Sequence, residues 1–551
     1  MTWPGANRRL AALVVTAAGL VAVALTSANS VAGARVSSQH LVISAAARHD
    51  ISAPLRELKV AWPARGGFTH EQPAQQATKS ATVDDPVLQS SATNPSRLSI
   101  TRSFPGISDG EHGFSVALQG GLPPDTDGAV GRAQYVQMVN LALAIFSKQG
   151  AMVLGPLPAN QVWKGFGGDC EKQDNGDPVV LYDHLADRWL LSQFAIDGGS
   201  SGKQSTECVA VSTSGDATGR YYRYAFDYTR YGAINDYPKL GIMPNAYYAT
   251  YNFTSPSLSA LVCALPRTAM LAGRPATQQC AFSAGNPSLM PADMDGRIAP
   301  PKNEPEYLLE KAPNALNLFR LTIDWARPAK SHLDGPTKIN VAPYNDACLI
   351  SAVPEEPNEI GCIPQPGSGP GGYASALEST GDRLMFRLAY RRFADGHEAL
   401  VVNHAASGSF PQGPVSGVRW YELDRRRGSW AVAQQGTYAP NLDSRWEGSI
   451  AMDRQGDIAL GYSVSGPATF PSIAMTGRLR GDPRGQLRAE QTVVAGMGSQ
   501  VLPRWGDYSA MTIDPTDDCT FWYTTEFLKL PGTFDWSTAI IAARFPDCHN
   551  R

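Results

Sequence analysis

The chain has little charge and no concentration of it. Charged residues make up 18% of the 551 residues, and 47 Lys and Arg stand against 50 Asp and Glu. Neither a polybasic stretch nor an acidic block occurs. A protein that binds nucleic acid through its phosphates needs a basic face, so nucleic acid is not an expected partner.

Long apolar runs are missing beyond the N-terminus. No later stretch reaches the roughly 18 apolar residues that cross a bilayer, so no stable membrane span is expected in the mature chain. Residues 1–34 begin with a positive region, continue with an apolar run and end in Ala32-Gly33-Ala34, the layout of a cleaved signal peptide. A retained anchor is the alternative. We expect a secreted or extracytoplasmic protein.

Cysteine pairs at C-x-x-C spacing are absent, which argues against zinc or thioredoxin-like chemistry. The eight cysteines all follow the predicted signal peptide, as expected for disulfides in an exported chain. We predict that sequence neighbours pair, because each pair would then staple adjacent antiparallel strands. The predicted pairs are Cys170–Cys208, Cys263–Cys280, Cys348–Cys362 and Cys519–Cys548.

Signatures of several catalytic classes are absent as well. The chain contains no G-x-S-x-G nucleophile elbow, no P-loop and no H-E-x-x-H metal motif. What it has is turn residues, with 52 Gly and 41 Pro, which indicates many turns and few long helices. Residues 35–95, rich in Ala, Ser, Gln, Pro and Thr, are predicted to be a linker or pro-segment with little fixed structure.

Residues 96–551 have the texture of a repeated β-domain. The string ALESTGD (376–382) matches AMDRQGD (451–457), and similar strand starts fall near residues 125, 177, 236, 293, 373, 447 and 507. Units of this size with four short strands each are typical of a β-propeller. We predict an all-β, disulfide-stapled propeller with seven four-stranded blades. Six or eight blades, or a pair of β-sandwiches, are the alternatives.

Ring closure can be predicted too. The last unit ends near residue 545, and the segment RLSITRSF (97–104) reads as an isolated strand far upstream. Pairing these two segments would complete the last blade and leave no open edge.

Acidic residues stand at the predicted strand starts. The first strand of each propeller blade lines the central channel, so these acids would converge at one mouth. Close carboxyl groups perturb each other's pKa and can act as acid and base in glycoside cleavage. The catalytic candidates are Glu447, Asp507 and Asp177. Turn capping through backbone N–H groups is the alternative.

Two D-x-D-G strings are candidate metal sites. In an extended segment, residues two apart point the same way, so both carboxylates of a string could face one calcium ion. The candidates are Asp125 with Asp127 and Asp293 with Asp295. A simple turn is the alternative.

Arginine and tryptophan supply candidate substrate contacts. Arg383, Arg387 and Arg391 fall on one face of a predicted strand and could hold an anionic group or form a structural network. The parallel strings RWEG (445–448) and RWGD (504–507) each combine a cation, an aromatic ring and an acid. The binding candidates there are Arg445, Trp446, Arg504 and Trp505. Packing of both tryptophans between blades is the alternative.

Four strings carry a resemblance to a known family. They are PPDTDGAVGRAQYVQMVN (123–140), GDPVVLYDHLADRWLLSQF (176–194), RLMFRLAYRRF with GHEALVVNH (383–404), and RWGDYSAMTIDPTDDCTFWYTTEF (504–527). They resemble a largely uncharacterised family of exported bacterial β-propeller proteins, which implies the fold and no reaction. The architecture is loosely similar to sialidase-type propellers. Because the S-x-D-x-G-x-T-W and F-R-I-P motifs are missing, no sialidase residue is carried over.

Together these features predict an exported propeller that recognises an extracellular polysaccharide, either neutral or acidic, with hydrolase or lyase activity. A non-catalytic scaffold for adhesion or protein binding is the alternative, because propellers host both roles. Calcium is the one candidate cofactor, and a monomer is expected.

Overall fold

The computed structural model describes twelve ranges of the chain: 39–58, 83–110, 114–115, 123–197, 204–254, 258–347, 361–369, 372, 374–410, 413–426, 428–532 and 535–548. The predicted signal peptide lies outside these ranges. Among the described residues, no helix has both the length and the apolar character to cross a membrane.

The strands form where short β-branched and aromatic runs alternate with polar turns. Val179, Val180, Leu181 and Tyr182 form a fully buried strand, and the chain then reverses at Asp183. The Asp183 carboxylate accepts the N–H of Ala186, and Asp187 adopts a left-handed conformation. Aspartate tolerates both roles, which explains why D-x-x-x-D ends the strand here.

Each unit is an antiparallel meander of consecutive strands. The first is β6 (Asp127–Val130), β7 (Gln134–Val139), β8 (Ala142–Ser147) and β9 (Met152–Pro158). The second is β10 (Gly176–Asp183), β11 (Arg188–Asp197), β12 (Gln204–Ser212) and β13 (Tyr221–Asp227). The third is β14 (Asp236–Met243), β15 (Ala246–Phe253), β16 (Ser259–Leu265) and β17 (Thr277–Ala284).

The next two meanders share one sheet, because their first strands β18 and β23 pair in parallel. One consists of β18 (Met290–Asp295), β19 (Glu306–Ala312), β20 (Ala315–Thr322) and β21 (His332–Asn340). The other consists of β23 (Met385–Arg392), β24 (Glu398–Phe410), β25 (Gly413–Arg426) and β26 (Ser429–Tyr438), with β4 (Leu88–Gln89) and β22 (Asn345–Asp346) at its margins.

Two further meanders complete the set. They are β27 (Ser444–Met452), β28 (Ile458–Gly466), β29 (Thr469–Arg478) and β30 (Gln491–Val494), and then β31 (Ala510–Ile513), β32 (Phe521–Leu528) and β33 (Trp536–Arg544). Helices are short connectors: α2 (Asp169–Lys172), α3 (Arg267–Leu271), η1 (Leu55–Glu57), η2 (Ala159–Trp163), η4 (Thr229–Tyr231) and η5 (Pro328–Lys330).

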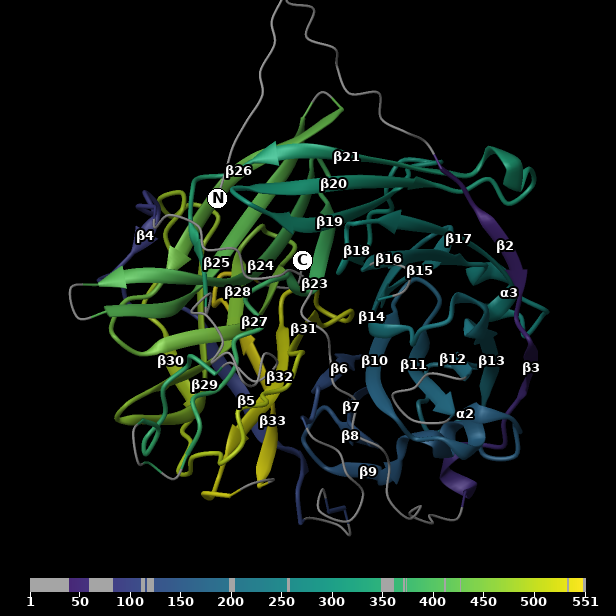
Figure 1. Ribbon diagram of the computed structural model, residues 1–551, viewed down its shortest axis with the longest axis horizontal. Coiled ribbons are helices and arrows are strands. Elements are labelled where there is room, and N and C mark those ends of the chain that lie inside the picture. The colour runs from purple at the N-terminus through teal and green to yellow at the C-terminus, as the bar shows by residue number, and fades with distance from the viewer. Residues whose placement is uncertain are drawn as a thin grey trace, which may run out of the picture. The chain divides into compact units, whose positions relative to one another are not determined.

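The meanders are arranged in a ring around their first strands (Figure 1). These first strands contact one another in the cyclic order β6, β10, β14, β18, β23, β27, β31 and back to β6. The fold is therefore an all-β propeller, and this prediction is confirmed. The number of blades stays a prediction, because two of the meanders form a single continuous sheet.

The ring closes through a strand from the other end of the chain. β5 (Ser99–Ser108) pairs antiparallel with β33 and supplies the outer strand of the last meander. In Figure 1 the two strands lie side by side although they have opposite ends of the colour scale. The predicted closure is confirmed.

The N-terminal segment differs from its prediction. Residues 39–51 were expected to have little fixed structure, but they form β1 (Gln39–His40), β2 (Val42–Ala45) and β3 (Arg48–Ile51). These strands pair with the outer strands β21, β17 and β13 of three successive meanders. We call residues 39–58 the edge strap; in Figure 1 its purple strands β2 and β3 follow the outside of the ring.

The edge strap is held by buried contacts as well as by its strands. Leu55 is fully buried in the core of the first two meanders. Arg223 of β13, itself buried, donates to both carboxylate oxygens of Asp50 at 2.8 and 2.6 Å. These contacts could not be predicted from the composition of residues 35–95, because only a few residues of that segment make them.

Three predicted disulfides are present. Cys170 of α2 is bonded to Cys208 of β12, Cys263 and Cys280 join β16 to β17 at directly opposed positions, and Cys519 is bonded to Cys548 after β33. Cys362 is also disulfide-bonded, but its predicted partner Cys348 lies outside the described residues. Disulfides of this number indicate maturation in an oxidising compartment.

The edge strap yields a test of its structural role. Leu55→Ala should lower the free energy of unfolding by about 2 to 5 kcal/mol, because it leaves a cavity in a closed core. Ile51→Ala is the matched control, since Ile51 is 47% exposed in the same segment, and should change stability by less than about 0.5 kcal/mol. Equal effects of the two variants in chemical denaturation would mean that the strap is not docked.

Candidate functional site

The starts of the first strands share an unusual backbone. Asp177 in β10, Tyr237 in β14 and Glu447 in β27 all have φ between 46° and 53°. Each lies at a shift in the register of its ladder with the next strand. Such a bulge turns a side chain away from the sheet pattern and costs about 1 to 3 kcal/mol of backbone strain for a residue with a Cβ. These bulges direct polar side chains to one end of the ring.

Asp125, Asp177 and Asp507 are joined through a hydrogen-bonded bridge. The backbone N–H of Asp507 donates to Asp125 Oδ1 at 2.8 Å, and Asn140 Nδ2 donates to Asp125 Oδ2 at 2.6 Å. Asn140 Oδ1 in turn accepts the N–H of Asp177 at 2.9 Å. The Tyr508 hydroxyl donates to Asp177 Oδ2 at 2.8 Å. Three meanders therefore contribute to one polar centre.

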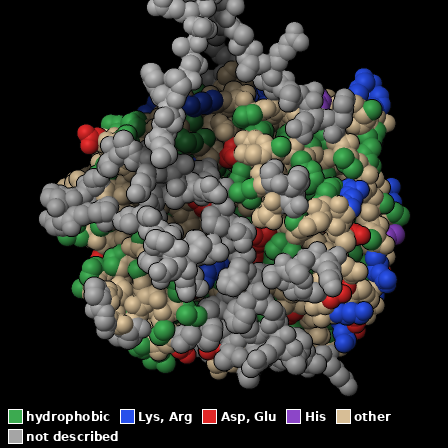
Figure 2. Space-filling model, viewed as in Figure 1, with side chains coloured by type: hydrophobic (Ala, Val, Ile, Leu, Met, Phe, Trp, Pro, Cys, Tyr) green, Lys and Arg blue, Asp and Glu red, His purple; other side chains and the backbone are tan. Residues whose placement is uncertain are grey.

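Arg504 links Asp507 to a further acid. Its guanidinium lies 3.1 Å from Asp507 Oδ2 and 2.7 Å from Glu378 Oε1. We call the seven carboxyl groups that interact here the strand-start cluster: Asp125, Asp177, Asp236, Glu378, Glu447, Asp507 and Glu526. Figure 2 shows a few acidic side chains (red) near the middle of one face, among hydrophobic (green) and other (tan) side chains.

Glu447 is the least satisfied member of the strand-start cluster. Its side chain is 1% exposed, and neither carboxyl oxygen has a well-aligned hydrogen-bond partner among the described residues. Burial raises its pKa well above the usual range, and the nearby Asp507 and Glu378 raise it further. Burial of Glu447 therefore favours its protonated form.

Other members hold protons for the same reason. Burial, followed by repulsion from Asp507, raises the pKa of Asp177 to about 6. Burial raises the pKa of Glu378 to about 7 even though Arg504 opposes the shift. The pKa values of Asp236 and Glu526 rise to about 8, again mainly through burial.

Lys239 lies within the same centre and escaped the sequence analysis. Its Nζ is 3.2 Å from the ring centroid of Tyr237 and 3.5 Å from that of Tyr508, so the amine is held between two aromatic faces. Burial lowers the pKa of Lys239 to about 7, against the pull of Asp177 and Asp507. The only sequence signal is the string DYPK (236–239), in which a cation follows an acidic strand start.

Arg383, Arg387 and Arg391 lie along the channel wall from one end to the other, and each binds different partners. Arg383 precedes β23, binds Asp382 and lies 4.5 Å from the ring centroid of Tyr237. Arg383 therefore lies beside the strand-start cluster. The other two are structural, as the alternative interpretation of the sequence held.

Arg387 is buried and fully engaged. It donates to the Asp293 carboxylate at 2.8 Å, to the Asp295 carboxylate at 2.5 Å and to the backbone oxygen of Met511. These contacts fit the structural alternative, and substrate binding by Arg387 stays a prediction. The Arg387 guanidinium binds both Asp293 and Asp295, as in the structural alternative, and a calcium site at these two acids stays a prediction.

The other D-x-D-G string also lacks a metal-like arrangement. Asp125 has a left-handed conformation, so it and Asp127 do not follow the alternation of an extended strand. Asp127 accepts the N–H of Gly128, and Asp125 is bound as described above. Among the described residues, no group of three or more His, Cys, Asp or Glu is placed to hold a metal ion.

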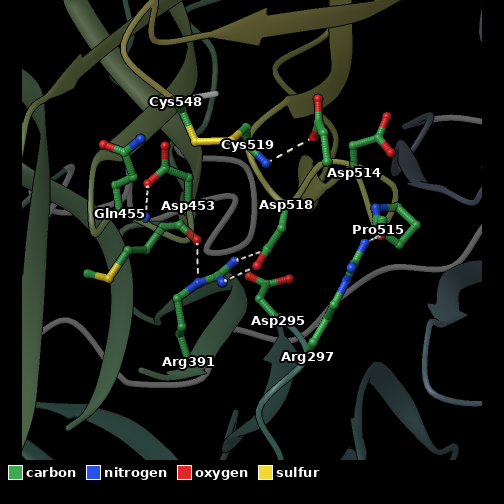
Figure 3. A network of polar contacts seen from close by, with 12 residues as sticks. Asp295, Arg297, Arg391, Asp453, Gln455, Asp514, Pro515, Asp518, Cys519 and Cys548 are labelled. Carbon is green, nitrogen blue, oxygen red and sulfur yellow. Dashed lines mark hydrogen bonds and ion pairs between the residues drawn. A yellow bond between two sulfur atoms is a disulfide. The ribbon is translucent and has the colours of Figure 1, made fainter. Parts of the chain in front are cut away.

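Arg391 closes the opposite end of the ring (Figure 3). It donates to both carboxylate oxygens of Asp518 at 3.0 and 2.7 Å and to the backbone oxygen of Met452. Asp518 adjoins Cys519, whose disulfide with Cys548 anchors the same turn. This contact joins β23, β27 and the β31–β32 turn, and is architectural.

The two R-W strings are architectural except for Arg504. Trp446 and Trp505 are 0% and 1% exposed and pack against each other with ring centroids 5.4 Å apart. Arg445 is buried and bonded to both oxygens of Glu490. These contacts fit the alternative of packing between blades, and substrate contact by Arg445, Trp446 and Trp505 stays a prediction.

Comparison with known proteins gives the architecture and little else. No family model and no curated protein matches the chain. Solved structures similar to it include an ulvan lyase from a new family of polysaccharide lyases (10% identity, 81% of this chain and 96% of that one, TM-score 0.32). Another is an exo-β-1,3-galactanase from Phanerochaete chrysosporium (11%, 82% and 97%, TM-score 0.30).

A third is a neuraminidase-like protein of a strain from the little yellow-shouldered bat in Guatemala (10%, 56% and 94%, TM-score 0.20). Membership of a family of exported propeller proteins and the looser likeness to sialidase-type propellers both stay predictions. Likenesses this distant carry no argument about what the chain does.

The proton-holding acids predict how stability depends on pH. The unfolded chain releases carboxyl protons near pH 4, whereas the folded chain holds them up to about pH 6 at Asp177, about 7 at Glu378 and about 8 at Asp236 and Glu526. Because the folded state binds more protons, its stability should fall as pH rises from about 4 to 8. Lys239 acts in the opposite sense only above about pH 7.

The measurement is the thermal midpoint at pH 5 and pH 7 at constant ionic strength. The double variant Asp236→Asn with Glu526→Gln should flatten the decline, and Asp84→Asn at an exposed position should leave it unchanged. A wild-type midpoint that increases from pH 5 to pH 7 would contradict the proton-holding cluster.

Because Arg387 already binds Asp293 and Asp295, we predict that the stability of the protein does not depend on calcium. Arg387→Met should lower the free energy of unfolding by about 3 to 5 kcal/mol, because both buried carboxylates lose their cation. Calcium or a chelator should leave the wild-type thermal midpoint unchanged. If calcium raised the midpoint and Asp293→Asn with Asp295→Asn abolished that increase, the D-x-D-G prediction would be supported.

Proposed function

We propose that the protein is a carbohydrate-active enzyme that cleaves an extracellular glycan at the strand-start cluster. One observation carries the proposal: Glu447, whose carboxyl oxygens have no well-aligned hydrogen-bond partner among the described residues, neighbours Asp507, which is ion-paired to Arg504. Two carboxyl groups in such different surroundings match the division of labour in glycoside hydrolysis, where one is a protonated acid and the other an ionised base or nucleophile.

The residues take distinct roles in this proposal. Glu447 donates its proton to the glycosidic oxygen as the bond breaks. Asp507, kept in place by Arg504 and with Oδ1 unpartnered, activates water or attacks the anomeric carbon. Asp177 is oriented by Tyr508 and adds negative charge where positive charge develops on the sugar.

The charge of the site bears on the choice of glycan. Seven carboxyl groups face three cations, Lys239, Arg383 and Arg504. Because burial favours the protonated form of several of these acids, the ionised acids and the three cations largely offset each other, and a neutral glycan is the better match. The acidic glycan considered from the sequence is the less favoured substrate.

Lyase chemistry is the second candidate activity, and a specific observation favours it. Lys239 lies between Tyr237 and Tyr508, and an amine with a pKa of about 7 can remove a proton next to a uronate carboxyl. Arg504 would then bind the uronate. Elimination requires an acidic polymer, whereas a neutral glycan is favoured for hydrolysis. The polymer that is cleaved therefore distinguishes the two activities.

A non-catalytic scaffold remains the alternative to both. It is favoured by the depth of the acids, since Glu447 and Asp507 are 1% and 2% exposed. The proposed biological setting is the same in all three cases: a secreted monomer, matured with disulfides, whose partner is an extracellular polysaccharide.

The test is turnover of a polymer panel by the purified protein. Arabinan and β-1,3-galactan represent neutral glycans, chitosan an amino-bearing one, and ulvan an acidic one. Reducing ends report hydrolysis, and absorbance of unsaturated uronates reports elimination. Glu447→Gln and Asp507→Asn should each lower hydrolysis by about 100-fold to 10,000-fold.

Asp518→Asn is the matched control, because Asp518 is a part-buried carboxylate at the opposite end of the ring. It should retain turnover once its folding is verified. Unchanged turnover in both Glu447→Gln and Asp507→Asn would remove these residues from the mechanism. Unsaturated products that depend on Lys239 would establish the lyase reading instead.

A further inference from the structure

A cavity lies at the end of β14 that is opposite the strand-start cluster. It has a volume of about 590 Å³ and is lined by the β14–β15 turn, the loop at 299–306 and the loop at 322–327. β14 carries Asp236 at its start and Met243 at the cavity. Eight residues of strand separate these ends by about 23 Å, so the two sites cannot share one sugar.

The rim of this cavity presents a fixed aromatic ring. Trp325 is 36% exposed, the one tryptophan with large exposure among the described residues. Its Nε1 donates to the backbone oxygen of Asn245 at 3.0 Å, which fixes the ring plane. An exposed indole held by its own polar atom is a preformed stacking surface.

The loop that carries Trp325 is rigid for local reasons. The Asp324 carboxylate accepts the N–H groups of Ala326 and Arg327, and the N–H of Asp324 donates to Ser331 Oγ at 2.9 Å. The facing loop contains three prolines at 300, 301 and 305. A ligand would therefore lose little affinity to ordering of the walls.

The cavity also contains an unsatisfied buried acid. Glu306 lines it, is 1% exposed, and neither of its carboxyl oxygens has a well-aligned hydrogen-bond partner among the described residues. Burial raises the pKa of Glu306 well above its usual range and so favours the protonated carboxyl group, which can both donate and accept a hydrogen bond. A neutral hydroxyl-bearing ligand suits such a group, whereas an anion gains nothing from it.

We propose that this cavity is a second carbohydrate-binding site, in which Trp325 stacks on a sugar ring of a neutral glycan and Glu306 hydrogen-bonds to its hydroxyl groups. The site holds the polymer while the strand-start cluster acts on another part of the chain or on a neighbouring chain. Tethering of this kind raises the local concentration of polymer without any new contact at the reacting bond. The role as a tether rests on the proposed function, whereas the binding itself does not.

Binding and turnover are therefore measured separately. Affinity electrophoresis through gels containing arabinan or β-1,3-galactan reports binding, and reducing-end release reports turnover. Trp325→Ala should weaken retardation by about tenfold in dissociation constant, and Trp325→Phe should retain part of it. Glu306→Gln keeps hydrogen-bonding capacity and should weaken binding less than Glu306→Ala.

The matched control is Leu185→Ala. Leu185 is 38% exposed in the β10–β11 turn at the corresponding end of the neighbouring meander, so it tests for loss of any exposed apolar side chain. This variant should migrate like the wild type. Glu447→Gln should also keep full retardation, which separates failure of this site from failure of the proposed catalysis.

Chemical protection gives a readout that needs no mutation. N-bromosuccinimide oxidises exposed indoles, and mass spectrometry should find Trp325 modified first. Saturating soluble arabinan or β-1,3-galactan oligosaccharide should slow this modification. The proposal is overturned if neither polymer retards the wild type, or if Trp325→Ala is retarded as strongly as the wild type.

Discussion

The pairing of β5 with β33 is the contact on which the site depends. A ring of meanders has no covalent closure, so its last sheet must obtain an outer strand from elsewhere or expose an edge. With the ring closed, β31 returns to β6, and Asp507 comes within hydrogen-bond distance of Asp125, which lies 382 residues away. Convergence of the acids is thus a consequence of closure, not of any local motif.

Much of the fold could be predicted because its signals are periodic. Turn residues at regular intervals predict the meanders, and three disulfides follow from the pairing of sequence neighbours. The edge strap could not be predicted, because a segment that adds single strands to existing sheets needs only a few apolar residues and keeps a polar composition. Leu55 is a single buried residue, and one residue does not form a hydrophobic pattern that can be recognised in the sequence.

The candidate site could be predicted only in part. Acids at strand starts converge because the fold repeats, and Glu447, Asp507, Asp177 and Arg504 do meet. The directions of the side chains around Trp446 depend on the bulge between Trp446 and Ser449, and such bulges shift side chains between faces without a sequence signature. Lys239 was missed because a lone lysine within a strand has no pattern of its own.

The edge strap has a consequence for the order of events during synthesis. Its three strands emerge before any meander, and they pair with β13, β17 and β21 in the reverse of their own order. As the chain grows, β3 can pair first, then β2 and then β1, so the edge strap docks progressively toward the N-terminus. Each of these three outer strands can therefore pair with a strap strand that has already been synthesised.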